Sequence, residues 1–434
     1  MSTKNKNLIL FLYFSILFIN YEIFAFITSF LIIITTLKSK IIKFDLDATK
    51  AKIIISAFYI LKYLSAILNI DTFWASSSLK SYFTPAKFVD MQAFLFPIKC
   101  RAIESNVQKF KIYGTENYYD CAIKSNYGPI DQFIIIDFDL TIVTFLFSLL
   151  LILLYINSIF NLINSFEKNV FLLTIIALSP PINFLIQRMN IDLFIFLVIH
   201  FAYKKLSGKQ MMSIYLLLMF LSLLKIYVIF VFFGFLLFNY FSKNYRGFFS
   251  NLAALSVSLG IYTYFGYFRT SQYFEVRPFR PDRSYGFLSE VIKLEKLGFK
   301  YLYFVFIFSY LIYAVYLLKN SNLSVESTNI FKNKEAWPYL FLFLGTCLYA
   351  NYDYRISILI FISYIFFKVK NIYLFIFLIF IYSHPSIIHG YNESFAIVES
   401  YFIFYLDTIF LIFFYLINKD FILYFKYEIY YKYK

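Results

Sequence analysis

Residues 170–192 read VFLLTIIALSPPINFLIQRMNID, and this stretch decides the expected fold class. It is apolar enough for a membrane-spanning helix, yet Ser179-Pro180-Pro181 interrupts it. Proline removes a backbone donor and its ring collides with the preceding turn, so we expect one helix to end there and another to start. Serine followed by proline is also a favourable N-cap and first-turn pair. A helix end that lies within the membrane has to line a cavity or be covered by protein.

Apolar runs of the same kind recur along the chain. It has 434 residues, of which 61% are hydrophobic and 15% charged, whereas a soluble protein carries about 25% charged residues. We therefore expect an all-α polytopic membrane protein with about thirteen transmembrane helices, its N-terminus outside and its C-terminus inside. The expected spans are residues 8–36, 53–70, 133–160, 170–187, 193–203, 211–224, 226–241, 252–268, 301–318, 337–349, 356–367, 372–383 and 402–417.

The net charge of +15 comes from basic residues placed as in membrane proteins, where they set the orientation of the spans. Lysines lie mostly in short segments between apolar runs, which is typical of cytoplasmic connections and argues against nucleic-acid binding. The three cysteines form no CxxC pair, and the three histidines add no ligand spacing, so the sequence predicts no metal site and no cofactor.

The longest polar interval, residues 71–132, is expected to be a large loop outside the cytoplasm. A loop of this length is usually functional. It contains Asp90, Cys100 and Cys121. If the loop faces an oxidising compartment, we expect the two cysteines to form a disulfide that contributes roughly 3 kcal/mol. A second outer loop is expected at residues 269–300.

With this topology, the ionisable residues outside the lysine-rich connections gather on the outer side. They are Asp90, Arg188, Asp192, Lys225, Arg277, Arg280, Arg283, Asp353 and Arg355. Ionisable groups near spans indicate a functional cavity, in which cations suit a phosphate and a carboxylate suits a general base.

Each of these residues also has a structural interpretation. Asp90 can be a solvated loop carboxylate, which its sequence context alone favours. Arg188 and Asp192 can form an i,i+4 ion pair, and Lys225 can extend to lipid headgroups. The three arginines of the second outer loop can bind anionic lipid. Asp353 and Arg355 can form an ion pair behind the site.

The order of the motifs resembles that of a known family. Ser179-Pro180-Pro181 followed by Arg188-Met189-Asn190-Ile191-Asp192 is similar to the pattern Ser-Pro-Pro, spacer, Arg-Gly-Asn-x-Asp of glycosyltransferase family 87 in the GT-C superfamily. Further similar segments are Lys225-Ile226-Tyr227, Asn351-Tyr352-Asp353-Tyr354-Arg355, Phe88-Val89-Asp90, and the two cysteines followed by Asn126-Tyr127. The chain departs from the family pattern at Met189, Val228, Gly128 and Gln92.

The resemblance implies an inverting membrane glycosyltransferase with a polyprenyl-phosphate sugar donor, mannose being the first choice of sugar, and a lipid or glycan acceptor. It implies a multi-pass protein of the bacterial plasma membrane that acts in cell-envelope assembly with an extracytoplasmic active site. Asp90 is then the catalytic base. The expected donor-phosphate cations are Arg277, Arg280, Arg283, Lys225 and Arg355, and the expected polar cavity residues are Arg188, Asn190, Asp192, Asn126, Tyr127, Tyr352 and Asp353.

The expected organisation is an extra N-terminal span with its connection at residues 1–52, a GT-C-like domain at 53–418 and a basic tail at 419–434. Two other classes fit a similar layout. A flippase or transporter for a lipid-linked sugar moves its substrate without a covalent product and needs no carboxylate base. A polysaccharide polymerase or ligase shares the large outer loop.

Overall fold

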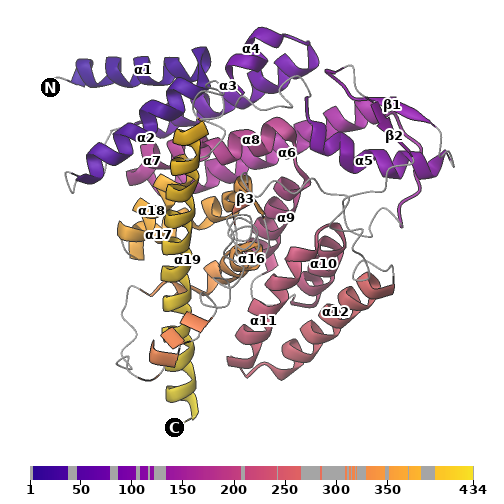
Figure 1. The fold of residues 1–434 in the computed structure, drawn as a ribbon, viewed down its shortest axis with the longest axis vertical. Coiled ribbons are helices and arrows are strands. Elements are labelled where there is room, and N and C mark those ends of the chain that lie inside the picture. Colours follow the sequence, from indigo (N-terminus) through magenta and orange to yellow (C-terminus); the bar gives the residue numbers. More distant parts are fainter. Residues whose placement is uncertain are drawn as a thin grey trace. The chain divides into compact units, whose positions relative to one another are not determined.

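The computed structural model is almost entirely helical (Figure 1). It describes residues 3–37, 46–78, 87–103, 108–115, 118–121, 133–206, 211–241, 243–264, 284–285, 329–347, 351–369, 371–382 and 396–433, with a few residues between 308 and 319. The chain divides into two compact units. Unit 1 comprises Met1–Phe201 and Ile381–Glu399, and unit 2 comprises Ala202–Phe380 and Ser400–Lys434. The expected boundaries at residues 52 and 419 fall inside helices α3 and α19.

Unit 1 is built on helices with one short hairpin. Its elements are α1 (Thr3–Ile19), α2 (Tyr21–Leu37), α3 (Ala48–Ile67), α4 (Asp71–Ser76), α5 (Val89–Ala102), β1 (Lys109–Lys111), β2 (Tyr118–Asp120), α6 (Leu140–Ser165), α7 (Val170–Ala177), α8 (Pro180–Arg188) and most of α9 (Ile191–Leu206). Helix α3 packs against α6 and α7, and α5 packs against α6 and α8. The first turn of α6 is fixed by Asp139, whose side chain accepts a hydrogen bond from the Ile142 N–H at 2.8 Å.

The first apolar run is not a single span. It forms α1 and α2, which separate at Asn20, and the Asn20 side chain accepts a hydrogen bond from the Ile23 N–H at 3.1 Å. The chain folds back there, as two contacts between α1 and α2 show. Tyr13 on α1 forms a hydrogen bond with Thr28 on α2, and its ring packs against that of Phe24. A side-chain cap in the middle of the run offers the backbone an alternative to one continuous helix.

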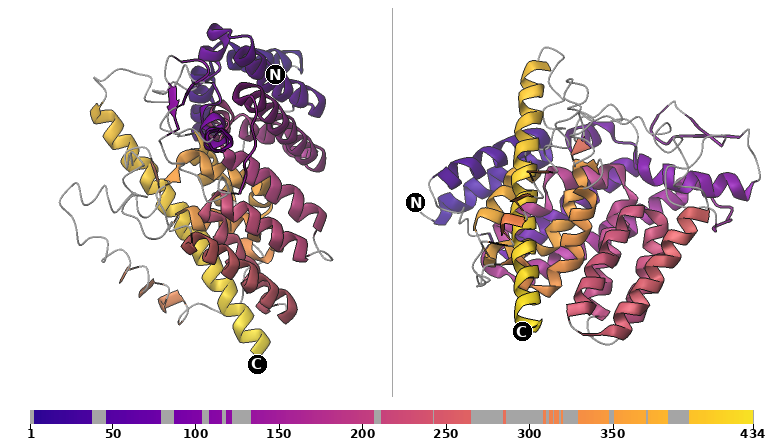
Figure 2. Two further views of the ribbon diagram at one scale, coloured as in Figure 1. Left: turned by 90° about the vertical axis from the view of Figure 1, so that its right-hand side faces the viewer. Right: turned by 60° about the horizontal axis from the view of Figure 1, so that its bottom comes forward.

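The polar interval after α3 is more ordered than the loop that we expected. It contains α4, the 14-residue helix α5, and an antiparallel hairpin in which Phe110 of β1 pairs with Tyr119 of β2. In Figures 1 and 2 the hairpin lies beside one end of α5. Helix α5 continues through Pro97, a residue that weakens any helix prediction from sequence.

Unit 2 is also helical, with one pair of two-residue strands. Its elements are α10 (Met211–Leu224), α11 (Ile229–Phe241), α12 (Tyr245–Tyr264), β3 (Ser284–Tyr285), α16 (Trp337–Cys347), β4 (Asn351–Tyr352), a 3-10 helix (Asp353–Ile362), α17 (Ser363–Val369), most of α18 (Asn371–Tyr382) and most of α19 (Ala396–Tyr433). The last two residues of α18 and the first four of α19 belong to unit 1. Figure 2 shows α19 as one long uninterrupted helix, which continues through the segment expected to be a separate basic tail.

Two glycines allow α11 and α16 to approach each other closely. A Cβ on Gly234 of α11 would lie 2.5 Å from the Phe341 ring of α16, and a Cβ on Gly345 of α16 would lie 2.2 Å from the Phe230 ring of α11. On each helix, a glycine thus leaves room for a phenylalanine ring of the other helix. Small residues serve this purpose in packed apolar helices.

The number of long apolar helices is smaller than the sequence predicted. Among the described residues, α6 alone is long and apolar enough to cross a membrane, and α7 with α8 adds a second if the bent pair counts as one span. The expectation of about thirteen spans is therefore wrong for this part of the chain. Most other apolar runs form helices of 10–17 residues, whereas crossing a bilayer takes about 20. Caps and breaks such as those at Asn20 and Pro180 shorten them.

Candidate functional site

The centre of the candidate site is the carboxylate of Asp90, in the first turn of α5. The Arg188 guanidinium binds it with two hydrogen bonds, from Nε to Oδ2 at 2.9 Å and from Nη2 to Oδ1 at 2.5 Å. Asn190 Nδ2 donates a third hydrogen bond to Oδ2 at 2.7 Å. These partners lie about a hundred residues further along the chain, so two separate predicted motifs meet at one carboxylate.

The end of α8 explains why Arg188 and Asn190 point to the same place. Met189 adopts the left-handed conformation with φ 49° and ψ 56°. Its N–H donates to the Ile186 carbonyl, and the Asn190 N–H donates to the Leu185 carbonyl, each at 3.1 Å. This pair of bonds is the Schellman ending of a helix, which usually has glycine at the left-handed position. Here a buried methionine takes this position.

Asn190 also starts the next helix. Its Oδ1 accepts a hydrogen bond from the Asp192 N–H at 3.0 Å, which is an N-cap contact of α9. With Oδ1 used in this way, the amide group is oriented so that Nδ2 points to Asp90. Asp192 itself is fully buried in the first turn of α9.

A second left-handed residue lies on the α5 side of the site. Phe88 has φ 55° and ψ 37°, and its N–H donates to the Gln187 carbonyl of α8 at 3.3 Å. Its buried ring packs against those of Tyr63, Trp74 and Phe145. Non-glycine residues in this conformation cost free energy and persist only where surrounding contacts enforce them, often at functional sites. A left-handed residue therefore lies close in sequence to each member of the ion pair, Phe88 before Asp90 and Met189 after Arg188.

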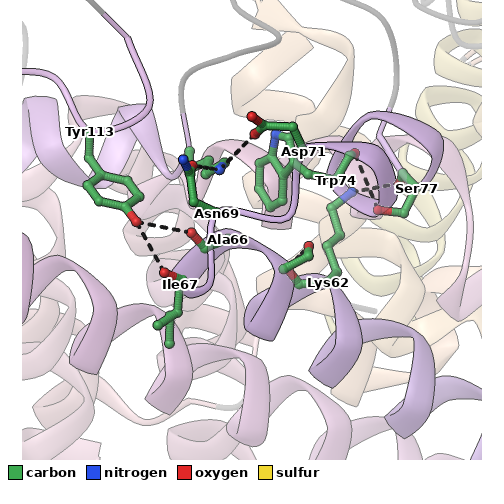
Figure 3. A network of polar contacts seen from close by, with 10 residues as sticks. Lys62, Ala66, Ile67, Asn69, Asp71, Trp74, Ser77 and Tyr113 are labelled. Atoms are coloured by element: carbon green, nitrogen blue, oxygen red, sulfur yellow. Dashed lines mark hydrogen bonds and ion pairs between the residues drawn. The ribbon is translucent and has the colours of Figure 1, made fainter.

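Lys87 anchors the turn that precedes Asp90. Its side chain is fully buried, and Nζ donates to Asn69 Oδ1 and lies 3.0 Å from a carboxylate oxygen of Asp71. The ammonium group also lies 6.0 Å from the centre of the Tyr113 ring. Figure 3 shows Asn69, Asp71 and Tyr113 around this point, with the Tyr113 hydroxyl donating to the carbonyls of Ala66 and Ile67. The lysine thus joins α3, α4 and the hairpin.

Gln92 connects the same turn to the hairpin. Its Nε2 donates to the Lys87 carbonyl at 2.7 Å, and its Oε1 accepts from the Tyr113 N–H at 2.9 Å. Only a side chain with both a donor and an acceptor can make this bridge, and arginine has no acceptor. Glutamine at position 92 therefore has a structural role that arginine could not fill.

Lys62 is a buried cation that the sequence analysis missed. It lies in α3, where Nζ donates to the Ser77 carbonyl at 2.8 Å (Figure 3) and to Asn183 Oδ1 at 2.5 Å. It also lies 5.4 Å from the centre of the Trp74 ring. A lone lysine inside the apolar run at residues 53–70 was the available signal, because an ionisable residue in such a run indicates a polar interior or a functional group.

The helix break at Ser179 is stabilised by tyrosines from four helices. Tyr21 donates to the Leu178 carbonyl at 2.6 Å, and Tyr382 donates to the Ile175 carbonyl at 2.5 Å. Tyr59 and Tyr155 both donate to the Ala177 carbonyl at 2.8 Å. The last carbonyls of a helix have no partner within it, so a buried helix end needs donors of this kind. The expected break is confirmed, with α7 and α8 bent by 42°.

The far end of α5 is fixed by covalent and ionic contacts. Cys100 on α5 and Cys121 after β2 form a disulfide with their Cα atoms 5.6 Å apart. Lys99 of α5 donates to Asp137, an exposed residue before α6, and this hydrogen bond lowers the pKa of the Asp137 carboxyl. Residues 133–139, expected to belong to a span, precede the helix.

The other predicted site residues are not assembled with Asp90 by any described contact. Lys225 lies in unit 2, where its N–H donates to the Leu221 carbonyl at the end of α10. For Tyr352, Asp353 and Arg355 only the backbone is described. Arg277, Arg280, Arg283, Asn126 and Tyr127 lie outside the described residues. The described part of the chain contains no group of three or more His, Cys, Asp or Glu that could hold a metal ion.

Comparisons of the chain with protein-family models, with curated proteins and with solved structures find no match.

Proposed function

We propose that this chain is a membrane-embedded inverting glycosyltransferase that uses a polyprenyl-phosphate sugar and has Asp90 as its general base. One observation carries the proposal. Phe88-Val89-Asp90 and Arg188-Met189-Asn190, two of the motifs that resemble the glycosyltransferase pattern, meet in space through three hydrogen bonds to one carboxylate. The two motifs of the resembling pattern thus share one partly buried carboxylate, which is the arrangement that the proposal needs.

The proposed reaction is a displacement at the anomeric carbon of the donor. An acceptor hydroxyl loses its proton to the Asp90 carboxylate while its oxygen forms the new bond to the anomeric carbon. The bond from that carbon to the phosphate oxygen breaks, and polyprenyl phosphate leaves with the electron pair. The configuration inverts through a transition state of oxocarbenium character. Cations near the departing phosphate stabilise the charge that develops there.

The candidate cations for the donor phosphate remain those expected from the sequence. Ser284 of β3 pairs with Tyr352 of β4, so a segment of the second outer loop lies beside the motif at residues 351–355. Each strand is close in sequence to a cation expected to bind the donor phosphate, Arg283 in one case and Arg355 in the other. Lys225, Arg277, Arg280, Arg283 and Arg355 remain the candidates for that role.

The distribution of polar and apolar side chains supports a membrane location. Large apolar side chains such as Phe11, Ile53 and Leu146 are exposed, whereas the charged Lys62 and the polar Asn183 are buried. A soluble protein of this kind would expose broad apolar patches to water. In a bilayer the same arrangement is favourable, because ionisable groups face the protein interior and apolar groups face lipid.

The proposal is tested by turnover in liposomes. Purified protein is incubated with polyprenyl-phosphate mannose and a mixture of lipid and glycan acceptors, and released polyprenyl phosphate and glycosylated product are measured. We expect product with the native chain and at least a hundredfold less with Asp90→Asn, on the scale of a lost general base. Asp137→Asn is the matched control, since it also neutralises a carboxylate paired with a cation in unit 1, and should keep full turnover.

The same assay separates the competing classes. Movement of the lipid-linked sugar across the bilayer without covalent product would replace the transferase by a flippase. Product formed equally well by the native chain and by Asp90→Asn, with both variants folded, would remove Asp90 from the mechanism.

A further inference from the structure

The Asp90–Arg188 pair differs from the neighbouring buried cations and acids in its exposure. The Arg188 side chain is 20% exposed and that of Asp90 is 12% exposed. Lys87, by contrast, has a side chain with no exposed surface, and Asp192 is also fully buried. Part of the pair therefore lies at the molecular surface, whereas these neighbours are enclosed.

The donors around Asp90 match a second type of anion. Two nitrogens of Arg188 bind two oxygens of one carboxylate, and a phosphate group presents two oxygens to an arginine in a similar arrangement. Asn190 adds a third donor, and its amide is held in place by the N-cap contact with Asp192. The site is a three-donor oxyanion site in which Asp90 is the resident anion.

The backbone contacts between α5 and α8 do not depend on this ion pair. The Phe88 N–H binds the Gln187 carbonyl, and the Phe88 ring is held among three aromatic rings. The two helix ends therefore stay together when the side chains change partners. Exchange at Arg188 requires rotation of side chains only.

We infer that a phosphate oxyanion of the substrate displaces the Asp90 carboxylate from Arg188 and Asn190, and that this exchange releases Asp90 to accept a proton. The inference rests on the proposed function for the phosphate-bearing substrate. It assigns Arg188 and Asn190 to phosphate binding. It also makes the base available only when the donor is bound.

A purely structural ion pair gives no reason for phosphate to bind more tightly when Asp90 is replaced. The exchange predicts that it does. A resident carboxylate competes with the incoming phosphate, so its removal raises the apparent affinity for phosphate. Asp90→Asn should therefore bind phosphate more tightly than the native chain, although it loses turnover. We expect a gain on the order of tenfold, the usual scale of coupling between two ligands.

Binding is measured on the full chain in nanodiscs of phosphatidylcholine, with inorganic phosphate and farnesyl phosphate as separate probes. Asp90→Asn should bind both probes more tightly than the native chain. The double variant Asp90→Asn with Arg188→Gln should lose the gain. Arg188→Lys keeps the charge but not the two-pronged geometry, and should bind both probes more weakly. Asp137→Asn, which neutralises the carboxylate bound by Lys99, should bind like the native chain.

The two probes separate a free phosphate from a lipid-linked one. A larger gain for farnesyl phosphate than for inorganic phosphate supports a lipid-linked ligand, and equal gains support a general phosphate site; both outcomes support the exchange. The inference is overturned if Asp90→Asn binds neither probe more tightly, or if the double variant keeps the gain. Retention of the Cys100–Cys121 disulfide and of the helical circular dichroism signal shows that each variant is folded.

Phosphate binding tests the exchange and turnover tests Asp90 as the base, so either claim can be rejected without the other. Lost turnover in Asp90→Asn without tighter phosphate binding would retain the base and reject the exchange. Tighter binding with unchanged turnover would retain the exchange and reject the base.

Discussion

Two residues in left-handed conformation, Phe88 and Met189, shape the candidate site. Each lies beside a member of the Asp90–Arg188 pair, and each is fully buried. Packing around the two side chains therefore compensates for a backbone conformation that costs roughly 1–2 kcal/mol for a non-glycine residue. At Met189 the conformation directs Arg188 and Asn190 to the same carboxylate.

Substitution of Met189 tests whether the backbone strain or the packing of the buried side chain has the larger effect on stability. Met189→Gly removes the strain but also a buried side chain, whose loss costs about 2–5 kcal/mol. We expect it to lower the free energy of unfolding by about 1–3 kcal/mol, the difference between the two terms. Met189→Val should be worse, because a β-branched residue in this conformation adds strain. Denaturant unfolding in detergent, monitored by circular dichroism, measures both, and a Met189→Gly variant more stable than the native chain would contradict the estimate.

At the scale of elements, the junction of α7 and α8 depends on side chains from distant helices. The Ala177 carbonyl accepts two hydroxyl donors, from Tyr59 on α3 and from Tyr155 on α6. The Leu178 carbonyl accepts one, from Tyr21 on α2. The broken helix is thus tied to its neighbours by hydrogen bonds as well as by apolar packing.

The shared acceptor predicts non-additive effects of mutation. Tyr59→Phe or Tyr155→Phe alone leaves Ala177 with one donor, and each should cost about 1 kcal/mol of stability. The double variant leaves a buried carbonyl with neither donor, so it should cost about 1–3 kcal/mol more than the sum. Tyr113→Phe combined with Tyr59→Phe is the control and should be additive, since the Tyr113 hydroxyl donates to the carbonyls of Ala66 and Ile67, away from Ala177. A double-mutant cycle of thermal unfolding midpoints checks this, and additivity of the Tyr59 and Tyr155 effects would contradict shared capping.

At the scale of the whole chain, the exposed apolar surface makes a prediction about location. Many large apolar side chains on α1, α2, α3, α6 and α12 are exposed, and α6 is long enough to cross a bilayer. We expect the chain to stay in the membrane pellet after washing with alkaline carbonate and to be extracted by detergent. Recovery in the carbonate supernatant would show peripheral association and would contradict membrane embedding.

Several elements were predictable because their signals are local. The apolar runs at residues 211–224, 337–349 and 372–383 closely match helices α10, α16 and α18. Polar residues flank each of these runs, and a helix needs little more than such a pattern and its caps. The helix break at Pro180 was equally predictable, since proline acts on its own helix.

The parts that were missed depend on contacts over long distances in sequence. Helix α5 contains Pro97, and the chain before α5 adopts a left-handed turn at Phe88 that packing enforces. The burial of Lys62 depends on Ser77 and Asn183. The fold-back at Asn20 brings Tyr13 to Thr28, fifteen residues further along the chain. None of these contacts leaves a strong periodic signal in the sequence.

The amino-acid sequence was enough to predict the helical class and the helix break at Ser179, and the family resemblance drew attention to Asp90. These follow from hydrophobic pattern, proline chemistry and motif order, which act within a few turns of chain. Only the tertiary structure decided that Arg188 binds Asp90 rather than serving only as a partner for Asp192 on its own segment. The physical reason is that two charged groups so far apart in sequence interact only after α5 and α8 have packed end to end and removed them from most of the surrounding solvent.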